Sequence, residues 1–292
     1  MIPASTGRRV DDNAAFPAKG SCNAMGVPLN ASRMPAMYLP HGGGPSFFMT
    51  GERKRMYQPT EDFLRSIRGL LPATPTAILI ATAHWETAVP SFTGGRRPEL
   101  IYDYYGFPPE TYELRYGAPG HPELAERAAA LIRKAGYSAV VDPHYGWDHG
   151  VFIPLKVMFP DADIPVVAMS LHASLDPALH CGLGAALRSL RDDGVLIVGA
   201  GMSFHNLRDF NAAAAASYAF HDWLDSALSG NWGERSERLA RWSNAPGGRA
   251  SHPREEHLMP LMVASGAGSD SPARRLWRGS VGPSCLAAWA FD

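Results

Sequence analysis

The sequence predicts one α/β domain with a central, mostly parallel or mixed sheet flanked by helices. From Pro35 onward, short apolar runs alternate with segments of helical periodicity, which is the pattern of strands joined by crossover helices. No internal repeat and no linker-like segment interrupts this alternation, and 292 residues suit one large domain. In such sheets ligands bind beyond the carboxyl ends of the strands, so a functional site is expected there.

Each predicted element follows from its apolar pattern. The runs rich in aliphatic residues, which are expected to form the strands, are residues 36–39, 76–83, 137–141, 164–171, 195–200 and 286–291. The segments with apolar residues at helical spacing, which are expected to form helices, are residues 60–71, 122–135, 177–192, 212–228 and 254–265. The stretches rich in Gly and Pro, residues 94–120 and 245–253, are expected to be functional loops inserted into the domain.

The first residues differ in composition from the rest of the chain. Residues 1–33 mix Pro, Gly, Ser, Asn and Ala without an apolar period, which predicts a disordered N-terminal extension before a domain of residues 34–292. This segment lacks the apolar stretch of a secretory signal, and Asp11 and Asp12 argue against a transit peptide. No run in the sequence approaches the roughly 20 apolar residues that span a bilayer, so a cytoplasmic protein without a membrane partner is expected.

Charge and cysteine content argue against two further classes of protein. The formal net charge is -1, so no basic surface is expected to attract nucleic acid. The three cysteines, Cys22, Cys181 and Cys285, lie far apart and form no CxxC pair, which argues against a disulfide framework and a thiolate metal site. These features indicate a protein of a reducing compartment.

The candidate chemistry lies in histidines that follow apolar runs. His41 and His84 come directly after two predicted strands, His205 comes shortly after a third, and His257 is expected to enter from the start of a helix. Converging imidazoles form sites for Fe(II) or Zn, although a single such histidine more often packs or caps an element. Of the other histidines, His121 is expected to begin a helix, and those expected at the surface or at helix caps are His180, His221 and His252.

A further acid and imidazole stand side by side in Gly-Trp-Asp-His-Gly. Asp148 is expected to hold His149 in one tautomer, so that His149 can act as a proton shuttle. Two other kinds of site fit poorly. Ser203 has no Gly-x-Ser-x-Gly elbow around it, and Gly-Ala-Gly at residues 199–201 lacks the third glycine of a dinucleotide-binding loop.

Several short motifs occur in the order typical of one family. They are Tyr-Leu-Pro-His-Gly-Gly-Gly-Pro at 38–45, Ala-His-Trp-Glu at 83–86, Tyr-Asp-Tyr-Tyr-Gly-Phe-Pro at 102–108, Trp-Asp-His-Gly at 147–150, Gly-Ala-Gly at 199–201 with His-Asn-Leu at 205–207, and Glu-His-Leu at 256–258. Over about residues 35–267 the chain resembles the class III extradiol ring-cleavage dioxygenases, specifically the DOPA 4,5-dioxygenase-like branch.

The resemblance implies a metal-dependent extradiol dioxygenase that inserts O2 into a catechol-type aromatic, DOPA or another catechol. It implies one non-haem Fe(II) per chain, with zinc possible in the isolated protein, and His41, His84 and His257 as its ligands. By the same resemblance, His205 is either the catalytic acid/base or a further ligand, and His149 is a second catalytic histidine that contacts substrate. A carboxylate next to His257, Glu255 or Glu256, stays open as the third ligand.

Aromatic residues near these motifs are candidates for the walls of a substrate pocket: Tyr102, Tyr104, Tyr105, Phe107 and Trp147, of which Tyr105 and Trp147 are predicted to bind the substrate. Two rival functions stay open. One is a zinc-dependent hydrolase in which Glu86 or Glu256 serves as general base, and the other is a non-catalytic binding protein on the same fold. The expected partners are a small aromatic diol and O2, and the expected assembly is a monomer or homodimer.

Overall fold

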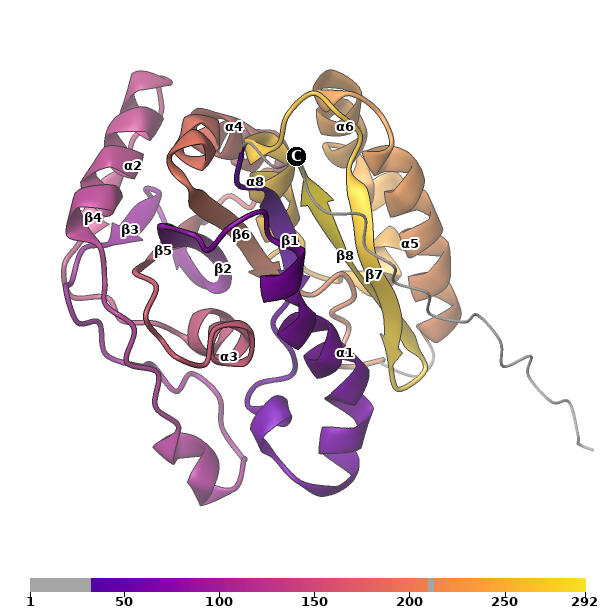
Figure 1. The fold of residues 1–292 in the computed structure, drawn as a ribbon. Helices are drawn as coiled ribbons and strands as arrows, with labels where there is room; N and C mark the ends of the chain where they lie inside the picture. Colours follow the sequence, from indigo (N-terminus) through magenta and orange to yellow (C-terminus); the bar gives the residue numbers. More distant parts are fainter. Residues whose placement is uncertain (1–32, 210–212) are drawn as a thin grey trace, which may run out of the picture.

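An eight-stranded mixed sheet forms the centre of the computed structural model, which describes residues 33–209 and 213–292 (Figure 1). The strands lie in the order β4 (Val140–Asp142), β3 (Ser91–Thr93), β5 (Val166–His172), β2 (Ala77–Thr87), β6 (Val195–Gly201), β1 (Ala36–Pro40), β8 (Ser284–Phe291) and β7 (Arg274–Val281). The predicted α/β fold class is therefore confirmed. The predicted N-terminal extension lies outside the described residues, apart from Arg33.

The centre of the sheet is parallel and its edges are mixed. β5, β2, β6 and β1 pair in parallel, β8 and β7 add an antiparallel edge, and β3 pairs antiparallel with β5 but parallel with β4. Strands buried on both faces need continuous apolar runs, and β1 and β6 are buried along their whole length. The parallel block directs the carboxyl ends of β1, β2 and β6 to one edge of the sheet.

Helices cover both faces of the sheet and create two hydrophobic cores (Figure 1). One face packs against α1 (Gly51–Leu70) and α3 (His149–Met158). The other face packs against α2 (Pro122–Lys134), α4 (Pro177–Leu187), α5 (Ala214–Leu228), α6 (Trp232–Leu239) and α8 (Met259–Ala267). The remaining helices are α7 (Gly248–Ser251) and four 3-10 helices, Ser46–Phe48, Pro109–Glu113, Arg188–Asp193 and Trp242–Asn244.

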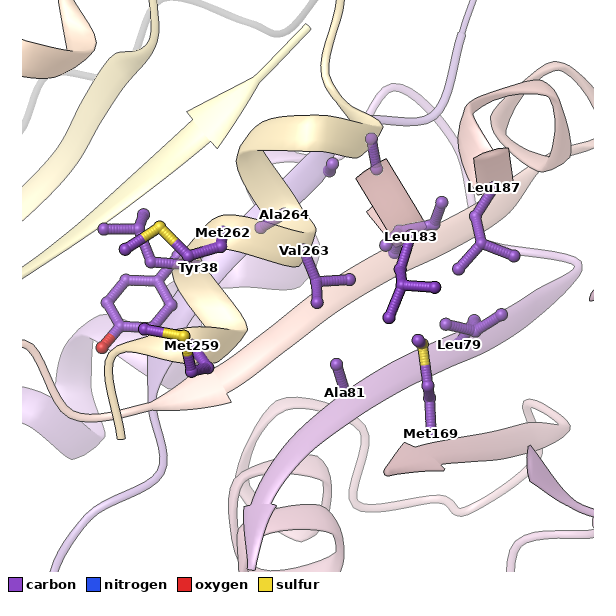
Figure 2. Packing of buried hydrophobic residues seen from close by; sticks show 14 of the residues in the cluster. Tyr38, Leu79, Ala81, Met169, Leu183, Leu187, Met259, Met262, Val263 and Ala264 are labelled. Carbon is purple, nitrogen blue, oxygen red and sulfur yellow. The ribbon is translucent and has the colours of Figure 1, made fainter. Parts of the chain in front are cut away.

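The alternation of side chains along each strand decides which core they join. Met37 and Leu39 of β1 belong to the core under α1 and α3, whereas Tyr38 between them belongs to the core under α8. Figure 2 shows this second core, in which Met262 and Val263 of α8 lie over the sheet beside residues of α4. α8 thereby rests on β1 and β6, and the turn that precedes it reaches the carboxyl edge of the sheet.

Proline and glycine account for the largest differences from the predicted helices. α1 begins at Gly51 rather than at residue 60, because Pro59 interrupts the sequence pattern while the helix accommodates it. α3 was not predicted, since Gly150 and Pro154 disfavour a helix and its almost complete burial leaves no amphipathic period. α8 begins at Met259 rather than at residue 254, because residues 254–258 form a turn.

Two strands and a helix that the sequence pattern did not predict are either short or lie at an edge of the sheet. β3 has three residues, β7 is an edge strand with a mostly half-buried pattern, and α6 has eight residues. Such elements carry little periodicity, so their sequences resemble loops. Within residues 33–209 and 213–292, no helix is both long and apolar enough to cross a membrane.

Three histidines lie in the protein interior, contrary to the prediction that they occupy the surface or caps. His180, His221 and His252 are fully buried. His180 accepts a hydrogen bond from the backbone N–H of His172 at 3.1 Å, and its Nδ1 donates to the carbonyl of Asp176 at 2.6 Å. Backbone partners therefore satisfy a buried neutral ring, which the sequence pattern could not show. His121 caps α2, as predicted, by accepting from the N–H of Leu124.

We expect acid to destabilise the protein through such rings. Burial lowers the pKa of His180 to about 4, so between pH 6.5 and about 4 the unfolded chain binds a proton that the folded chain does not. The free energy of unfolding should fall as the pH drops through this window, by about 2 kcal/mol at pH 5 for one such ring. In His180→Asn, the loss between pH 7 and pH 5, measured by urea denaturation, should be smaller by that amount.

The exposed His144 provides the control. His144→Asn should retain the wild-type loss of stability between pH 7 and pH 5. Parallel pH curves for His180→Asn and the wild type would contradict the assignment of a buried neutral ring at position 180.

Candidate metal centre

Within the described part of the chain, five histidines converge where the central strands end. His41 follows β1, and His84 lies on the last part of β2, after its pairing with β6 has ended at Thr82. A register shift between Ala81 and Glu86 interrupts the pairing of β2 with β5, and such irregularities redirect side chains near functional sites. The other members are His205 after β6, His149 at the start of α3 and His257 just before α8.

Each of the five rings lies against at least one of the others. His41 Nε2 lies 3.3 Å from His84 Nε2. The His41 ring centroid lies 5.3 Å from that of His149 and 5.1 Å from that of His257, and the His84 and His149 centroids are 3.9 Å apart. His205 stacks on His257 with centroids 3.4 Å apart. All five histidines gathered here are among the site residues expected from the sequence.

A carboxylate that the sequence reasoning missed contacts two of these rings. Asp103 Oδ1 lies 2.8 Å from His149 Nδ1 and accepts from the His149 backbone N–H, while its Oδ2 lies 3.3 Å from His84 Nδ1. Asp148, which was predicted to hold His149, instead accepts from Thr82 Oγ1 at 2.7 Å. Asp148 precedes α3 as its N-cap residue, and this position turns its side chain toward β2. The only sequence signal for Asp103 was its place in the motif at residues 102–108.

A second carboxylate contacts the stacked pair of rings. Glu256 Oε1 lies 2.9 Å from His257 Nδ1 and 3.2 Å from His205 Nδ1. Its Oε2 lies 3.3 Å from Arg254, which also forms two 2.6 Å contacts with the carboxylate of Glu86 on β2. This ion-pair network connects the turn before α8 with the end of β2.

The three carboxylates considered as a third metal ligand or as a general base, those of Glu86, Glu255 and Glu256, all contact neighbouring side chains. Glu255 pairs with Arg249 at 2.6 Å, away from the rings. Glu256 contacts the Nδ1 atoms of two histidines, and Glu86 pairs with Arg254. Of the two glutamates beside His257, Glu256 is therefore the one that contacts the cluster.

Three imidazoles and two carboxyl groups of the cluster have shifted pKa values. Burial and then the neighbouring histidines lower the pKa of His41 and of His257 well below the ordinary value. Burial, and then the adjacent His149, lowers the pKa of His84 to about 3. Burial opposes ionisation of Asp103 and Glu256, but hydrogen bonds from histidines outweigh it and lower the pKa of both carboxyls. Neutral imidazoles retain the lone pairs that a cation needs.

The nitrogen atoms of the cluster fit a metal ion. Two nitrogens bound tetrahedrally to one zinc at about 2.0–2.1 Å lie about 3.3 Å apart, and His41 Nε2 and His84 Nε2 are separated by 3.3 Å. His257 Nε2 is buried and has no hydrogen-bond partner among the described residues. Possible ligand atoms lie within 4.8 Å of one another in two groups, His41 with His84 and His149, and His205 with Glu256 and His257. The donor set therefore suits Fe(II) or Zn.

Backbone contacts hold the segment of His257 against the sheet. The His257 carbonyl accepts hydrogen bonds from Tyr38 Oη at 2.8 Å and from the Met202 N–H at 3.1 Å. A Cβ atom at Gly201 would lie 2.2 Å from that carbonyl, so only glycine permits this approach. The Gly201 carbonyl also accepts from the His41 N–H at 3.0 Å. The end of β6 thus positions two of the five histidines.

Aromatic side chains border the cluster on the side of His149. The Tyr104 ring lies 5.8 Å from His149 and 5.4 Å from Phe107. Tyr105, predicted to bind substrate, is 91% exposed, and Trp147, predicted likewise, is fully buried in the core. Tyr104, rather than Tyr105 or Trp147, is therefore the aromatic residue that borders His149.

Comparisons with known proteins agree on one family. Residues 35–284 match the family described as the catalytic LigB subunit of aromatic ring-opening dioxygenase. Dioxygenase tasH of Hapsidospora irregularis is 42% identical over 251 residues, which cover 80% of this chain and 78% of that protein. The 4,5-DOPA dioxygenase extradiol of Beta vulgaris is 38% identical over 234 residues, with 77% and 87% covered. A crystal structure of an uncharacterized Escherichia coli K12 protein has a TM-score of 0.71 at 28% identity, covering 89% of this chain and 100% of that chain.

We expect Gly150→Ala to disturb the cluster, because α3 approaches β2 at this residue. A Cβ atom there would lie 2.6 Å from Thr82 Oγ1 and 2.9 Å from His84 Cδ2. Such overpacking should lower the free energy of unfolding by about 1–3 kcal/mol, measured by urea denaturation. Gly117→Ala, whose Cβ would meet nothing within 4 Å, should change it by less than about 0.5 kcal/mol. Equal stability of the two variants would show that α3 does not pack on the His84 ring.

Proposed function

The chain belongs to the LigB family of aromatic ring-opening dioxygenases, and from this premise we propose that it is a metal-dependent extradiol dioxygenase acting on a catechol. The family predicted from the sequence motifs is thereby confirmed. The observation that carries the proposal is the convergence of five histidines with a 3.3 Å separation between two Nε2 atoms. Relatives named 4,5-DOPA dioxygenase extradiol support a catechol of the DOPA type as the substrate class.

We assign His41, His84 and His257 as the ligands of one Fe(II) per chain, with zinc as an alternative occupant. His41 and His257 are almost completely buried. His41 Nε2 lies 3.3 Å from His84 Nε2, and His257 Nε2 has no hydrogen-bond partner among the described residues. When bound, Fe(II) supplies a Lewis acid for the catechol hydroxyls and a redox centre for O2. Three neutral imidazoles leave positions of the metal open for these partners.

We assign proton transfer to His205 rather than a role as ligand. The side chain of His205 is 23% exposed, against 5% for the stacked His257, so His205 can exchange protons with solvent. With Glu256 at its Nδ1, His205 offers Nε2 to a substrate hydroxyl. We assign substrate contact to His149, because Asp103 fixes its ring and Tyr104 borders it.

We expect dioxygenase activity after anaerobic reconstitution with Fe(II). O2 uptake and visible absorbance with DOPA, caffeate and protocatechuate should reveal stoichiometric oxygen consumption and a new yellow product. His41→Ala and His84→Ala should abolish both signals and the retention of metal, and a strong chelator should do the same to the wild type. His144→Ala, which changes an exposed histidine, should leave both signals intact.

Two outcomes would overturn this proposal. Hydrolysis of esters by a zinc-loaded protein without O2 uptake would favour a zinc-dependent hydrolase. A protein that retains no metal under gentle purification and consumes no O2 would favour a binding protein on the same fold.

Variants of the stacked histidines, His257 and His205, should distinguish metal binding from proton transfer. In His257→Ala, iron content after gel filtration should fall to background together with activity. In His205→Ala, iron content should stay near that of the wild type, while kcat falls about 10²- to 10⁴-fold through loss of the proton acceptor. Equal loss of iron in both variants would make His205 a ligand.

A further inference from the structure

Two carboxylates divide four of the histidines into matched pairs. Asp103 contacts the Nδ1 atoms of His84 and His149, at 3.3 Å and 2.8 Å. On the other side of the cluster, Glu256 contacts the Nδ1 atoms of His257 and His205, at 2.9 Å and 3.2 Å. Each pair therefore contains one histidine assigned to the metal and one assigned to the substrate or its proton.

The carboxylate contact at Nδ1 of each histidine decides which ring nitrogen carries the lone pair toward the centre of the cluster. An ionised carboxylate only accepts hydrogen bonds, and a neutral imidazole carries its single N–H on one of two nitrogens. A carboxylate beside Nδ1 therefore favours the N–H there and leaves the lone pair on Nε2. For His84 this lone pair lies on the side of His41, since the two Nε2 atoms are 3.3 Å apart.

We propose that Asp103 and Glu256 are positioning residues, each of which fixes the tautomer and orientation of one metal-binding histidine and one substrate-side histidine together. This inference rests on the ligand roles assigned in the proposed function. It predicts that metal affinity and turnover depend on the same two carboxylates, although neither carboxylate binds the metal.

Independent contacts keep both carboxylates in place. Asp103 Oδ1 also accepts from the His149 backbone N–H at 2.8 Å, at the first turn of α3. Glu256 Oε2 lies 3.3 Å from Arg254, whose guanidinium forms two 2.6 Å contacts with Glu86. Since Glu86 is two residues beyond His84 on β2, this network joins the strand that carries His84 to the turn that carries Glu256 and His257.

The neighbouring Glu255 supplies a matched control for Glu256. Both glutamates precede His257 in the same turn, but Glu255 pairs with Arg249 at 2.6 Å instead of with a histidine. Glu255→Gln removes the same charge one residue away and should leave the tautomers of the cluster unchanged. Asp103→Asn and Glu256→Gln retain the shape of the side chains but introduce an amide that can also donate.

Zinc affinity, measured by competition with a chromophoric chelator, gives the first test and requires no turnover. Asp103→Asn and Glu256→Gln should bind Zn²⁺ about 10- to 100-fold more weakly than the wild type, and Glu255→Gln should match the wild type. In the Fe(II)-loaded enzyme, kcat of the two variants should fall in parallel with affinity. Wild-type zinc affinity in both variants would overturn the proposal.

Nitrogen-15 NMR of the imidazoles gives a second test that depends on no variant. In the zinc-loaded wild type, the rings of His84, His149, His205 and His257 should carry their proton on Nδ1. Protons on Nε2 of these rings would overturn the proposal even if a variant failed to fold. Because zinc affinity and tautomers are measured without O2, an absence of dioxygenase activity would count against the proposed function while leaving this inference to be judged separately.

Discussion

The site depends on the contact between the carbonyl of His257 and the end of β6. Tyr38 Oη and the Met202 N–H both donate to this carbonyl, and Gly201 allows it to approach the strand. The same end of β6 accepts from the His41 N–H. A larger residue at position 201 would displace the turn before α8, and with it both His257 and Glu256. The Gly-Ala-Gly segment thus allows two backbone segments to pack closely, rather than forming a phosphate-binding loop.

Burying several imidazoles together requires that each remain neutral and that its N–H be satisfied. Burial, and then mutual proximity, depresses the pKa values of His41, His84 and His257, which favours the neutral form. Asp103 and Glu256 then supply acceptors at the Nδ1 atoms of His84 and His257. Burying these imidazoles in the neutral form keeps their lone pairs available at a cost in folding stability, as is common at functional sites.

The sequence predicted the parts of the site that follow from strand ends. His41 and His84 stand directly after apolar runs, so the parallel sheet brings them to one edge. The pairing of carboxylates with histidines could not be predicted in the same way, because it depends on the direction of side chains. Asp148 is the sequence neighbour of His149, yet from the N-cap position of α3 its side chain faces Thr82, whereas Asp103 reaches His149 from a separate loop. The fold class was predictable, while short edge strands and the buried helix α3 carried too little periodicity.

The loop that supplies Asp103 also supplies the aromatic border of the cluster. Tyr104 and Phe107 follow Asp103 within the same motif, and Tyr104 donates to the Thr111 carbonyl at 2.6 Å, which closes the loop on itself. A change in the aromatic residues would therefore move the carboxylate that contacts two histidines. Under the proposed function, recognition of the substrate ring and orientation of the imidazoles would therefore be coupled in one segment. Glu256 lacks such a coupling, because Arg254 and Glu86 hold it from outside the aromatic border.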